Sequence, residues 1–240
     1  MDLEKYKYIA HRGLHNEKYN ILENTLEAFE NAINNNYAIE LDVQLTKDNK
    51  LVVFHDYNIK RMTNKEAYIK DLTLSELKKI KLKESLSTIP TLDEVLSLVD
   101  GKVALLIEIK NEGKSGKLEK VLEDTLNKYK GMVILESFNP FVVRYFKKKT
   151  KYMCGLLATK TYTSLKGKIL GLFINFFIST NILKADFIAY DFSDFDNKVS
   201  KKIIKSKLPL LLWTIDNIED AKKALQIGDG IIFEKIDITK

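Results

Sequence analysis

Residues 38–44 read AIELDVQ and place the charged side chains of Glu40 and Asp42 among apolar residues. The apolar and branched residues of this stretch predict a β-strand. Side chains two residues apart on a strand share a face, so Glu40 and Asp42 point the same way. A largely apolar strand with two carboxylates on one face predicts a functional site in the wall of a β-sheet.

Seven other short apolar runs occur along the chain, and with Ala38–Gln44 they make eight predicted strands. The other seven are Tyr6–His11, Val103–Lys110, Met132–Phe138, Tyr152–Thr159, Asp186–Asp191, Pro209–Asp216 and Asp229–Glu234. Helical patterns lie between most of them, at Thr25–Asn35, Leu92–Val99, Lys117–Tyr129, Pro140–Lys149, Lys198–Lys205 and Ile218–Gln226. Asn24, followed three residues later by Glu27, predicts a capping box at the start of the first helix.

This alternation predicts an α/β fold. Strands separated by helices pair in parallel, and eight such units in 240 residues are typical of a TIM (β/α)8 barrel. An open doubly wound sheet is the alternative, but the glycine-rich dinucleotide fingerprint is absent after the first strand.

The segment after Gln44 breaks the alternation. Residues 46–50 form a predicted tight turn, and Leu51–His55 a strand that returns antiparallel. With the turn centred near Asp48, His55 lies opposite Leu41, level with the two carboxylates. Residues 57–90, with a helical pattern at Thr73–Ile80, are then expected to be a small insertion on one barrel domain that covers residues 1–240.

Composition limits the class of protein. A hydrophobic share of 45% is enough for a substantial core, and the single cysteine, Cys154, excludes an internal disulfide. Neither a signal peptide behind Met1 nor an apolar run of about 18 residues is found, which predicts a soluble cytoplasmic protein without a transmembrane segment. The net charge is +6, but the lysines are scattered, so a basic nucleic-acid-binding module is only a remote alternative.

Polar side chains gather at the carboxyl ends of the predicted strands, where TIM barrels carry their active sites. They are His11, Glu40, Asp42, Glu108 and Lys110, with Arg12 next in the chain and His55 brought in by the hairpin. Three carboxylates in one mouth predict a divalent cation, and all-oxygen ligands favour Mg²⁺ or Ca²⁺ over zinc. Arg12 and Lys110 suit phosphate, and two histidines supply an acid and a base near neutral pH. This combination predicts cleavage of a phosphate ester, whereas His15 is expected to be merely exposed.

These residues lie in motifs that resemble the glycerophosphodiester phosphodiesterase family. The motifs are Ala10-His11-Arg12-Gly13, Glu23-Asn24-Thr25, Glu40-Leu41-Asp42-Val43 with Thr46 and Asp48, Val52-Val53-Phe54-His55-Asp56, Ile107-Glu108-Ile109-Lys110, Glu136-Ser137-Phe138-Asn139 and Leu212-Trp213-Thr214. They follow the family's order and cover nearly the whole chain. Two positions depart from the family pattern: Leu22 stands where a proline is frequent, and residues 233–236 replace a Thr-Asp-x-Pro motif.

The resemblance implies a barrel of the phospholipase C-like phosphodiesterase type and a role for each matching residue. These are Glu40, Asp42 and Glu108 as ligands of Mg²⁺ or Ca²⁺, His11 and His55 as the acid–base pair, Arg12 and Lys110 as phosphate contacts, Phe138 and Trp213 beside the substrate, and Glu23 and Asn24 as supporting residues. Family members hydrolyse glycerophosphodiesters to sn-glycerol 3-phosphate and an alcohol. In the usual proposal for them, the glycerol 2-hydroxyl attacks phosphorus and water opens the cyclic intermediate.

One apolar segment stands apart. Ile169–Ile178 reads ILGLFINFFI, which is too short to span a bilayer. It is either a buried barrel helix or an apolar lip beside the site that contacts a lysophospholipid or a membrane surface. A small glycerophosphodiester does not need such a lip, so the second interpretation favours an alternative function, lysophospholipase D-type hydrolysis of lysophospholipids.

Overall fold

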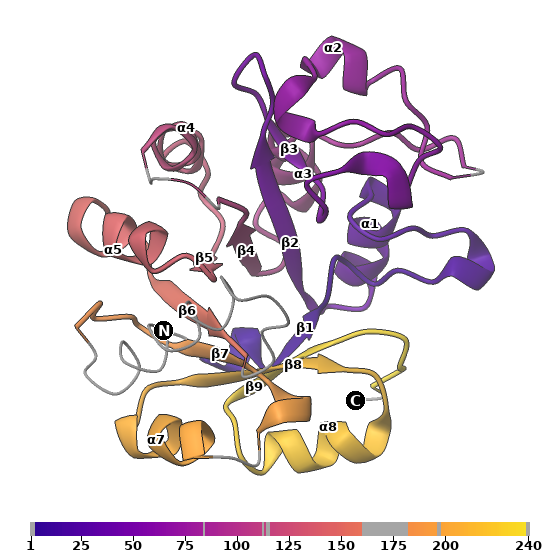
Figure 1. The fold of residues 1–240 in the computed structure, drawn as a ribbon. Coiled ribbons are helices and arrows are strands. Elements are labelled where there is room, and N and C mark those ends of the chain that lie inside the picture. Colours follow the sequence, from indigo (N-terminus) through magenta and orange to yellow (C-terminus); the bar gives the residue numbers. More distant parts are fainter. Residues whose placement is uncertain are drawn as a thin grey trace. The chain divides into compact units, whose positions relative to one another are not determined.

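The computed structural model describes residues 3–83, 85–111, 113, 116–159, 182–195 and 198–238 (Figure 1). The chain divides into two compact units. One is Ala10–Val133, and the other joins Met1–Ile9 to Ile134–Lys240. The apolar segment Ile169–Ile178 lies outside the described residues, so both interpretations of it stay predictions.

The unit Ala10–Val133 is built on a long strand, β2 (Ala38–Leu45), which pairs antiparallel with β3 (Leu51–Val53) and parallel with β4 (Leu105–Ile109). Its other elements are η2 (Glu17–Tyr19), α1 (Leu26–Asn34), η3 (Ile59–Arg61), η4 (Ile69–Asp71), α2 (Leu74–Leu77), α3 (Leu92–Val99) and α4 (Lys117–Leu126). Val43 faces Val53, which is the register predicted from a turn centred on Asp48. The returning strand is shorter than expected, because β3 ends two residues before His55.

The predicted insertion, residues 57–90, packs on the hairpin through its own apolar core. The buried members of this core are Leu22, Val52, Phe54, Ile59, Met62, Ile69, Leu77, Ile80, Leu82 and Ile89. The helix expected at Thr73–Ile80 is only the single turn α2, opened by a capping box between Thr73 and Glu76. It stops early because the amides of Lys79 and Ile80 bond three residues back, to Glu76 and Leu77, which tightens the chain into a 3₁₀-type turn.

The start of α1 differs from the predicted capping box. Thr25, not Asn24, is the N-cap, and its hydroxyl accepts a hydrogen bond from the amide of Ala28. Asn24 has a left-handed backbone with φ of 53°, a conformation that asparagine tolerates better than most residues. α1 packs against α3 (Figure 1) and buries Ala28 and Phe29.

The described part of the second unit contains parallel strands and helices. Its elements are η1 (Leu3–Tyr6), β5 (Val133–Ser137, starting at the unit boundary), α5 (Pro140–Lys149), β6 (Cys154–Ala158), β7 (Ile188–Asp191), η5 (Phe192–Asp194), α7 (Lys198–Ser206), β8 (Leu210–Ile215), α8 (Ile218–Leu225) and β9 (Gly230–Phe233). Each strand from β5 to β8 pairs in parallel with the next strand. Pro140 occupies the first turn of α5, where its missing N–H costs nothing.

Hydrogen bonding orders the strands of Ala10–Val133 as β4-β2-β3 and those of the other unit as β9-β8-β7-β6-β5, and β1 is Tyr8–Ala10. With the hairpin strand β3 set aside, consecutive strands within each unit pair in parallel, as in a TIM (β/α)8 barrel. The predicted fold class and all eight predicted strands are confirmed. Among the described residues, no helix is both long enough and apolar enough to cross a membrane.

Candidate active site

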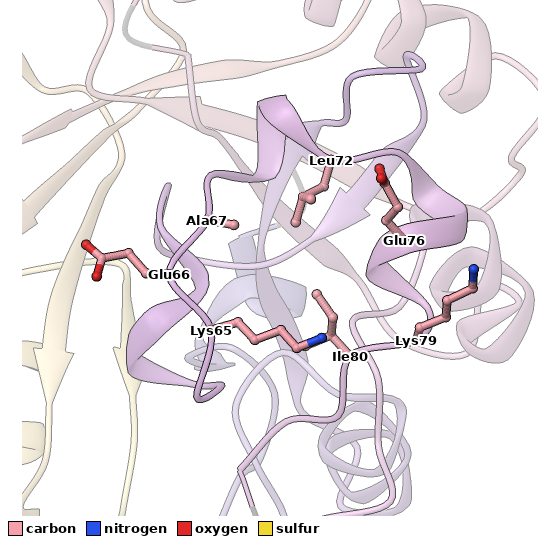
Figure 2. A pocket seen from close by; sticks show the side chains of 7 residues that line it. All are labelled: Lys65, Glu66, Ala67, Leu72, Glu76, Lys79 and Ile80. Atoms are coloured by element: carbon pink, nitrogen blue, oxygen red, sulfur yellow. The ribbon is translucent and has the colours of Figure 1, made fainter.

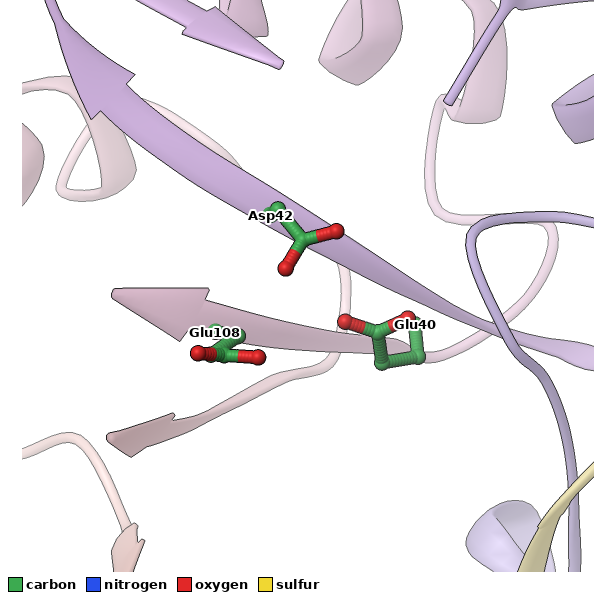
Figure 3. A group of neighbouring side chains, drawn as sticks. All are labelled: Glu40, Asp42 and Glu108. Atoms are coloured by element: carbon green, nitrogen blue, oxygen red, sulfur yellow. The ribbon is translucent and has the colours of Figure 1, made fainter. Parts of the chain in front are cut away.

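Three predicted carboxylates meet on one face of two neighbouring strands. Glu40 and Asp42 project from β2, and Glu108 projects from β4 directly beside Asp42 in the strand register (Figure 3). One ligand atom of each lies within 4.8 Å of the others. All three side chains are buried. The alternation of charged and apolar residues along β2 therefore does bring the two carboxylates together, and the parallel pairing adds the third.

Positive charges lie against this carboxylate cluster. Nζ of Lys110 is 2.7 Å from Oε1 of Glu108 and 3.1 Å from Oδ1 of Asp42. Burial alone would raise the pKa of Asp42. The charges of Lys110, His55 and Arg12 outweigh burial and lower that pKa. For Glu108 burial dominates and raises the pKa to about 7. Burial opposes the charge of Lys110 as well, yet the two carboxylates raise its pKa and keep it an ammonium.

The loop that carries Arg12 is tied to the same cluster through its backbone. The amide of Arg12 donates to Oε2 of Glu40 at 2.8 Å, and its carbonyl accepts from the amide of Asn24 at 2.9 Å. Arg12 and Gly13 both have positive φ, at 54° and 80°. A Cβ at Gly13 would lie 2.9 Å from atoms of Ala28, so the glycine is needed for both its conformation and its space.

Asn24 supports the carboxylate cluster directly. Its side-chain amide donates to Oδ2 of Asp42 at 2.8 Å, and both side chains are buried. The resemblance implied a supporting role for Asn24, and its backbone amide bonds the carbonyl of Arg12. The additional contact with Asp42 was not expected from the sequence.

The histidines differ in their surroundings. Nδ1 of His55 lies 2.6 Å from Oδ1 of Asp56. Burial lowers the pKa of His55, while the negative charge of Asp42 opposes that shift. His11 follows β1 and is half-buried. His15 is half-buried too, so the expectation that it is exposed was wrong; its place in the turn behind Gly13 explains the burial.

Two charged residues near His55 were missed by sequence reasoning, Asp56 and Arg61. Arg61 ends η3 and bonds both Asp56 and Glu23, and Glu23 in turn bonds Arg12. The adjacency of Asp56 to His55 was a signal in the sequence, since an aspartate can orient a neighbouring imidazole. Nothing in the pattern around Arg61 indicated its contacts, because they span 38 residues to Glu23.

The predicted substrate aromatics belong to the second unit. Phe138 follows β5 and Trp213 lies in β8, and the two rings meet edge to face with centroids 5.8 Å apart. The indole Nε1 of Trp213 is buried and has no hydrogen-bond partner among the described residues. Two aromatic residues 75 positions apart in the chain are thus in contact.

A separate hollow of about 510 Å³ lies on the insertion (Figure 2). Its lining is Lys65, Glu66, Ala67, Leu72, Glu76, Lys79 and Ile80. None of these is a predicted site residue. Ile80 belongs to the insertion's core and Leu72 packs against it, so the hollow is a surface depression over that core.

Comparison with known proteins decides the family. A sequence model described as "Glycerophosphoryl diester phosphodiesterase family" matches residues 11–238. The chain belongs to this family. It is 36% identical to a glycerophosphodiester phosphodiesterase of Caldanaerobacter subterraneus subsp. tengcongensis over 93% of this chain and 92% of that protein. This phosphodiesterase is therefore an enzyme of the phosphoric diester hydrolase class, as the resemblance implied.

Solved structures agree with the barrel fold of this phosphodiesterase. A glycerophosphodiester phosphodiesterase from Thermotoga maritima is 28% identical and aligns with a TM-score of 0.72, over 95% of this chain and 94% of that one. A phosphodiesterase from Oleispira antarctica, solved in complex with the product sn-glycerol-3-phosphate, aligns with a TM-score of 0.78 at 23% identity, over 95% of this chain and 92% of that one.

Proposed function

We propose that this phosphodiesterase hydrolyses glycerophosphodiesters to sn-glycerol 3-phosphate and an alcohol with the help of a divalent cation. The observation that carries the proposal is the carboxylate cluster of Glu40, Asp42 and Glu108, buried and with ligand atoms within 4.8 Å of one another. The product bound in the Oleispira antarctica phosphodiesterase supports glycerol 3-phosphate as the product here.

The donor set fits a hard cation. Its ligand atoms are carboxylate oxygens, which suit Mg²⁺ or Ca²⁺ rather than zinc. Burial raises the pKa of Glu108 to about 7, so the surroundings disfavour full ionisation of the cluster, and a bound cation would favour it. When bound, such a cation stabilises the negative charge that develops on the phosphate oxygens.

Lys110 and Arg12 are the proposed phosphate contacts. Lys110 is about 10% exposed and carries its charge beside Asp42 and Glu108. Arg12 has one guanidinium nitrogen on Glu23 and another 3.7 Å from Asp42, so its planar fork is held at the edge of the cluster. Both cations can bind phosphate oxygens while remaining close to the carboxylates, and Arg12 can do so with two parallel hydrogen bonds.

His55 and His11 are the proposed proton-transfer pair. With Nδ1 of His55 bonded to Asp56, its Nε2 is left to exchange a proton with the substrate. Burial lowers the pKa of His55, so its ring is neutral near pH 7 and can accept the proton of an attacking hydroxyl. His11, in the loop that also positions Arg12, then supplies the proton to the departing alcohol oxygen.

Phe138 and Trp213 are proposed to bind the organic part of the substrate. Their edge-to-face pair offers an apolar surface, and the buried indole N–H of Trp213 has no hydrogen-bond partner among the described residues. A buried donor without a partner costs free energy. A hydroxyl of the glycerol moiety would satisfy it.

The proposal is tested by an assay of purified protein on glycerophosphocholine, glycerophosphoethanolamine and lysophosphatidylcholine, each with and without EDTA. We expect glycerol 3-phosphate from the first two and no turnover in EDTA. Faster turnover of lysophosphatidylcholine than of both small diesters would instead support the lysophospholipase D-type alternative. Turnover of none of the three would contradict the proposed function.

A further inference from the structure

Arg61 uses three guanidinium nitrogens on two carboxylates. Its Nη1 and Nη2 donate to Oε2 and Oε1 of Glu23 at 2.9 and 2.6 Å, which is a bidentate pair. Its Nε donates to Oδ2 of Asp56 at 2.5 Å. The guanidinium of Arg61 therefore joins two acidic residues that lie 33 positions apart in the chain. The positive charges of Arg61 and Arg12 together balance the negative charges of these two carboxylates.

Each of the two carboxylates uses an oxygen to hold a proposed site residue. Oδ1 of Asp56 is 2.6 Å from Nδ1 of His55, and Oε1 of Glu23 accepts from Nη1 of Arg12 at 2.9 Å. Arg61 is thus linked through Asp56 to His55, the proposed base, and through Glu23 to Arg12, a proposed phosphate contact.

We propose that Arg61 is a positioning residue that fixes the orientation of His55 through Asp56 and that of Arg12 through Glu23. The inference rests on the proposed function, because it assigns a common support to two residues of that mechanism. It also gives the insertion a role, since η3 of the insertion supplies Arg61.

The backbone beneath Arg61 is firmly anchored. Ile59 and Met62, which flank the turn, are 0% and 1% exposed and belong to the insertion's core. The side chain of Arg61 itself is 45% exposed. An anchored turn with a half-exposed side chain is suited to positioning rather than to core packing.

A lysine cannot replace this arginine. The contacts with Glu23 and Asp56 need donors spread over a planar fork, whereas an ammonium group is a compact point charge. Arg61→Lys keeps the charge and much of the side-chain length, so it separates geometry from net charge. Lys60 is the matched control, because it lies on the same turn and its ammonium group bonds the exposed Glu66.

The first test measures kcat and KM for glycerophosphocholine with saturating Mg²⁺ or Ca²⁺. We expect Arg61→Gln and Arg61→Lys to lower kcat by tens to about 10²-fold, because small displacements of reacting groups are costly, and to raise KM. Asp56→Asn should lower mainly kcat, and Glu23→Gln should raise mainly KM. Lys60→Gln should stay within about twofold of wild type.

A double variant tests the shared path. If Arg61 acts on His55 through Asp56, then Arg61→Gln combined with Asp56→Asn should lower kcat no further than the more damaging single change. Multiplied effects of the two changes would contradict the relay.

The second test is the ¹⁵N spectrum of the histidine rings, which is simple because the chain has only three histidines. Wild-type His55 should show a proton held on Nδ1, and Arg61→Lys should shift the ring toward a mixture of tautomers while Lys60→Gln does not. An unchanged His55 spectrum in folded Arg61→Lys protein would overturn the proposal, whatever its kcat. This measurement needs no turnover, so it decides the role of Arg61 even if the diesterase function fails.

Discussion

The ammonium nitrogen of Lys110 lies 2.7 Å from Oε1 of Glu108, with the two side chains only 10% and 11% exposed. The same nitrogen is 3.1 Å from Asp42, which is 1% exposed. Two proposed metal ligands therefore share one buried counter-charge. We expect Lys110 to contribute to the stability of the fold in addition to its proposed contact with phosphate.

Lys110→Met should destabilise the metal-free protein strongly. Removing one partner of a buried ion pair typically costs about 3–5 kcal/mol, because the other charge stays buried alone. We expect urea unfolding in EDTA to show a loss of this order, and added Mg²⁺ or Ca²⁺ to stabilise the variant more than wild type. Lys120→Met, which breaks an exposed pair with Asp124, should change the free energy of unfolding by less than about 0.5 kcal/mol. Equal losses in the two variants would mean that Lys110 does not compensate the cluster.

Asn24→Ala and Thr25→Ala should have different effects although the residues are adjacent. Asn24 holds Asp42 through its side-chain amide, and loss of such support typically lowers metal affinity about 10–100-fold. Thr25 caps α1, and its loss should cost about 1 kcal/mol of stability without changing metal affinity. Calorimetric titration with Mg²⁺ or Ca²⁺ measures the first effect and thermal unfolding the second. Equally weakened metal binding in Thr25→Ala would contradict the assignment of Asn24.

The histidine roles predict a clear ranking. His11→Ala and His55→Ala should each lower kcat by about 10²–10⁴-fold, as is typical when a proton-transfer group is removed. His15→Ala should remain near wild type. Steady-state kinetics on glycerophosphocholine measures all three, and a defect in His15→Ala as large as that in His11→Ala would show that the wrong histidine was assigned.

Cys154 should report on unfolding. It is fully buried, and burial raises the pKa of its thiol well above the usual value. Iodoacetamide reacts with the thiolate, so the native protein should resist alkylation near pH 8, whereas the unfolded chain should react. Since the unfolded thiol ionises near pH 8.5 and the native one does not, this group's contribution to stability should fall as pH rises above that value. Mass spectrometry measures the rate of alkylation. Rapid alkylation under native conditions would contradict the buried position of Cys154.

The placement of the two carboxylates on β2 and the register of the hairpin could be predicted because local rules set them. Alternation along β2 places Glu40 and Asp42 on one face, and a short turn fixes which residue returns opposite Val43. Those features depend on a few neighbouring positions. Helix ends were less predictable, since competition between α and 3₁₀ hydrogen bonds decides where α2 stops.

The support around the site could not be predicted, because it depends on side chains that are distant in sequence. The contact between Asn24 and Asp42 spans 18 residues, and that between Arg61 and Glu23 spans 38. A capping preference at Asn24 was visible locally, but its tertiary contact prevailed and Thr25 became the cap. Packing of the insertion places η3, and no local pattern shows this packing in advance.

The central claim is that the carboxylate cluster holds the divalent cation on which hydrolysis depends. The most direct test follows release of glycerol 3-phosphate from glycerophosphocholine by ³¹P NMR, with protein stripped by EDTA and then refilled with Mg²⁺ or Ca²⁺. We predict no release from stripped protein, recovery on refilling, and failure of Glu40→Gln, Asp42→Asn and Glu108→Gln to recover at the same metal concentration. Full-rate release by stripped wild-type protein would contradict the account.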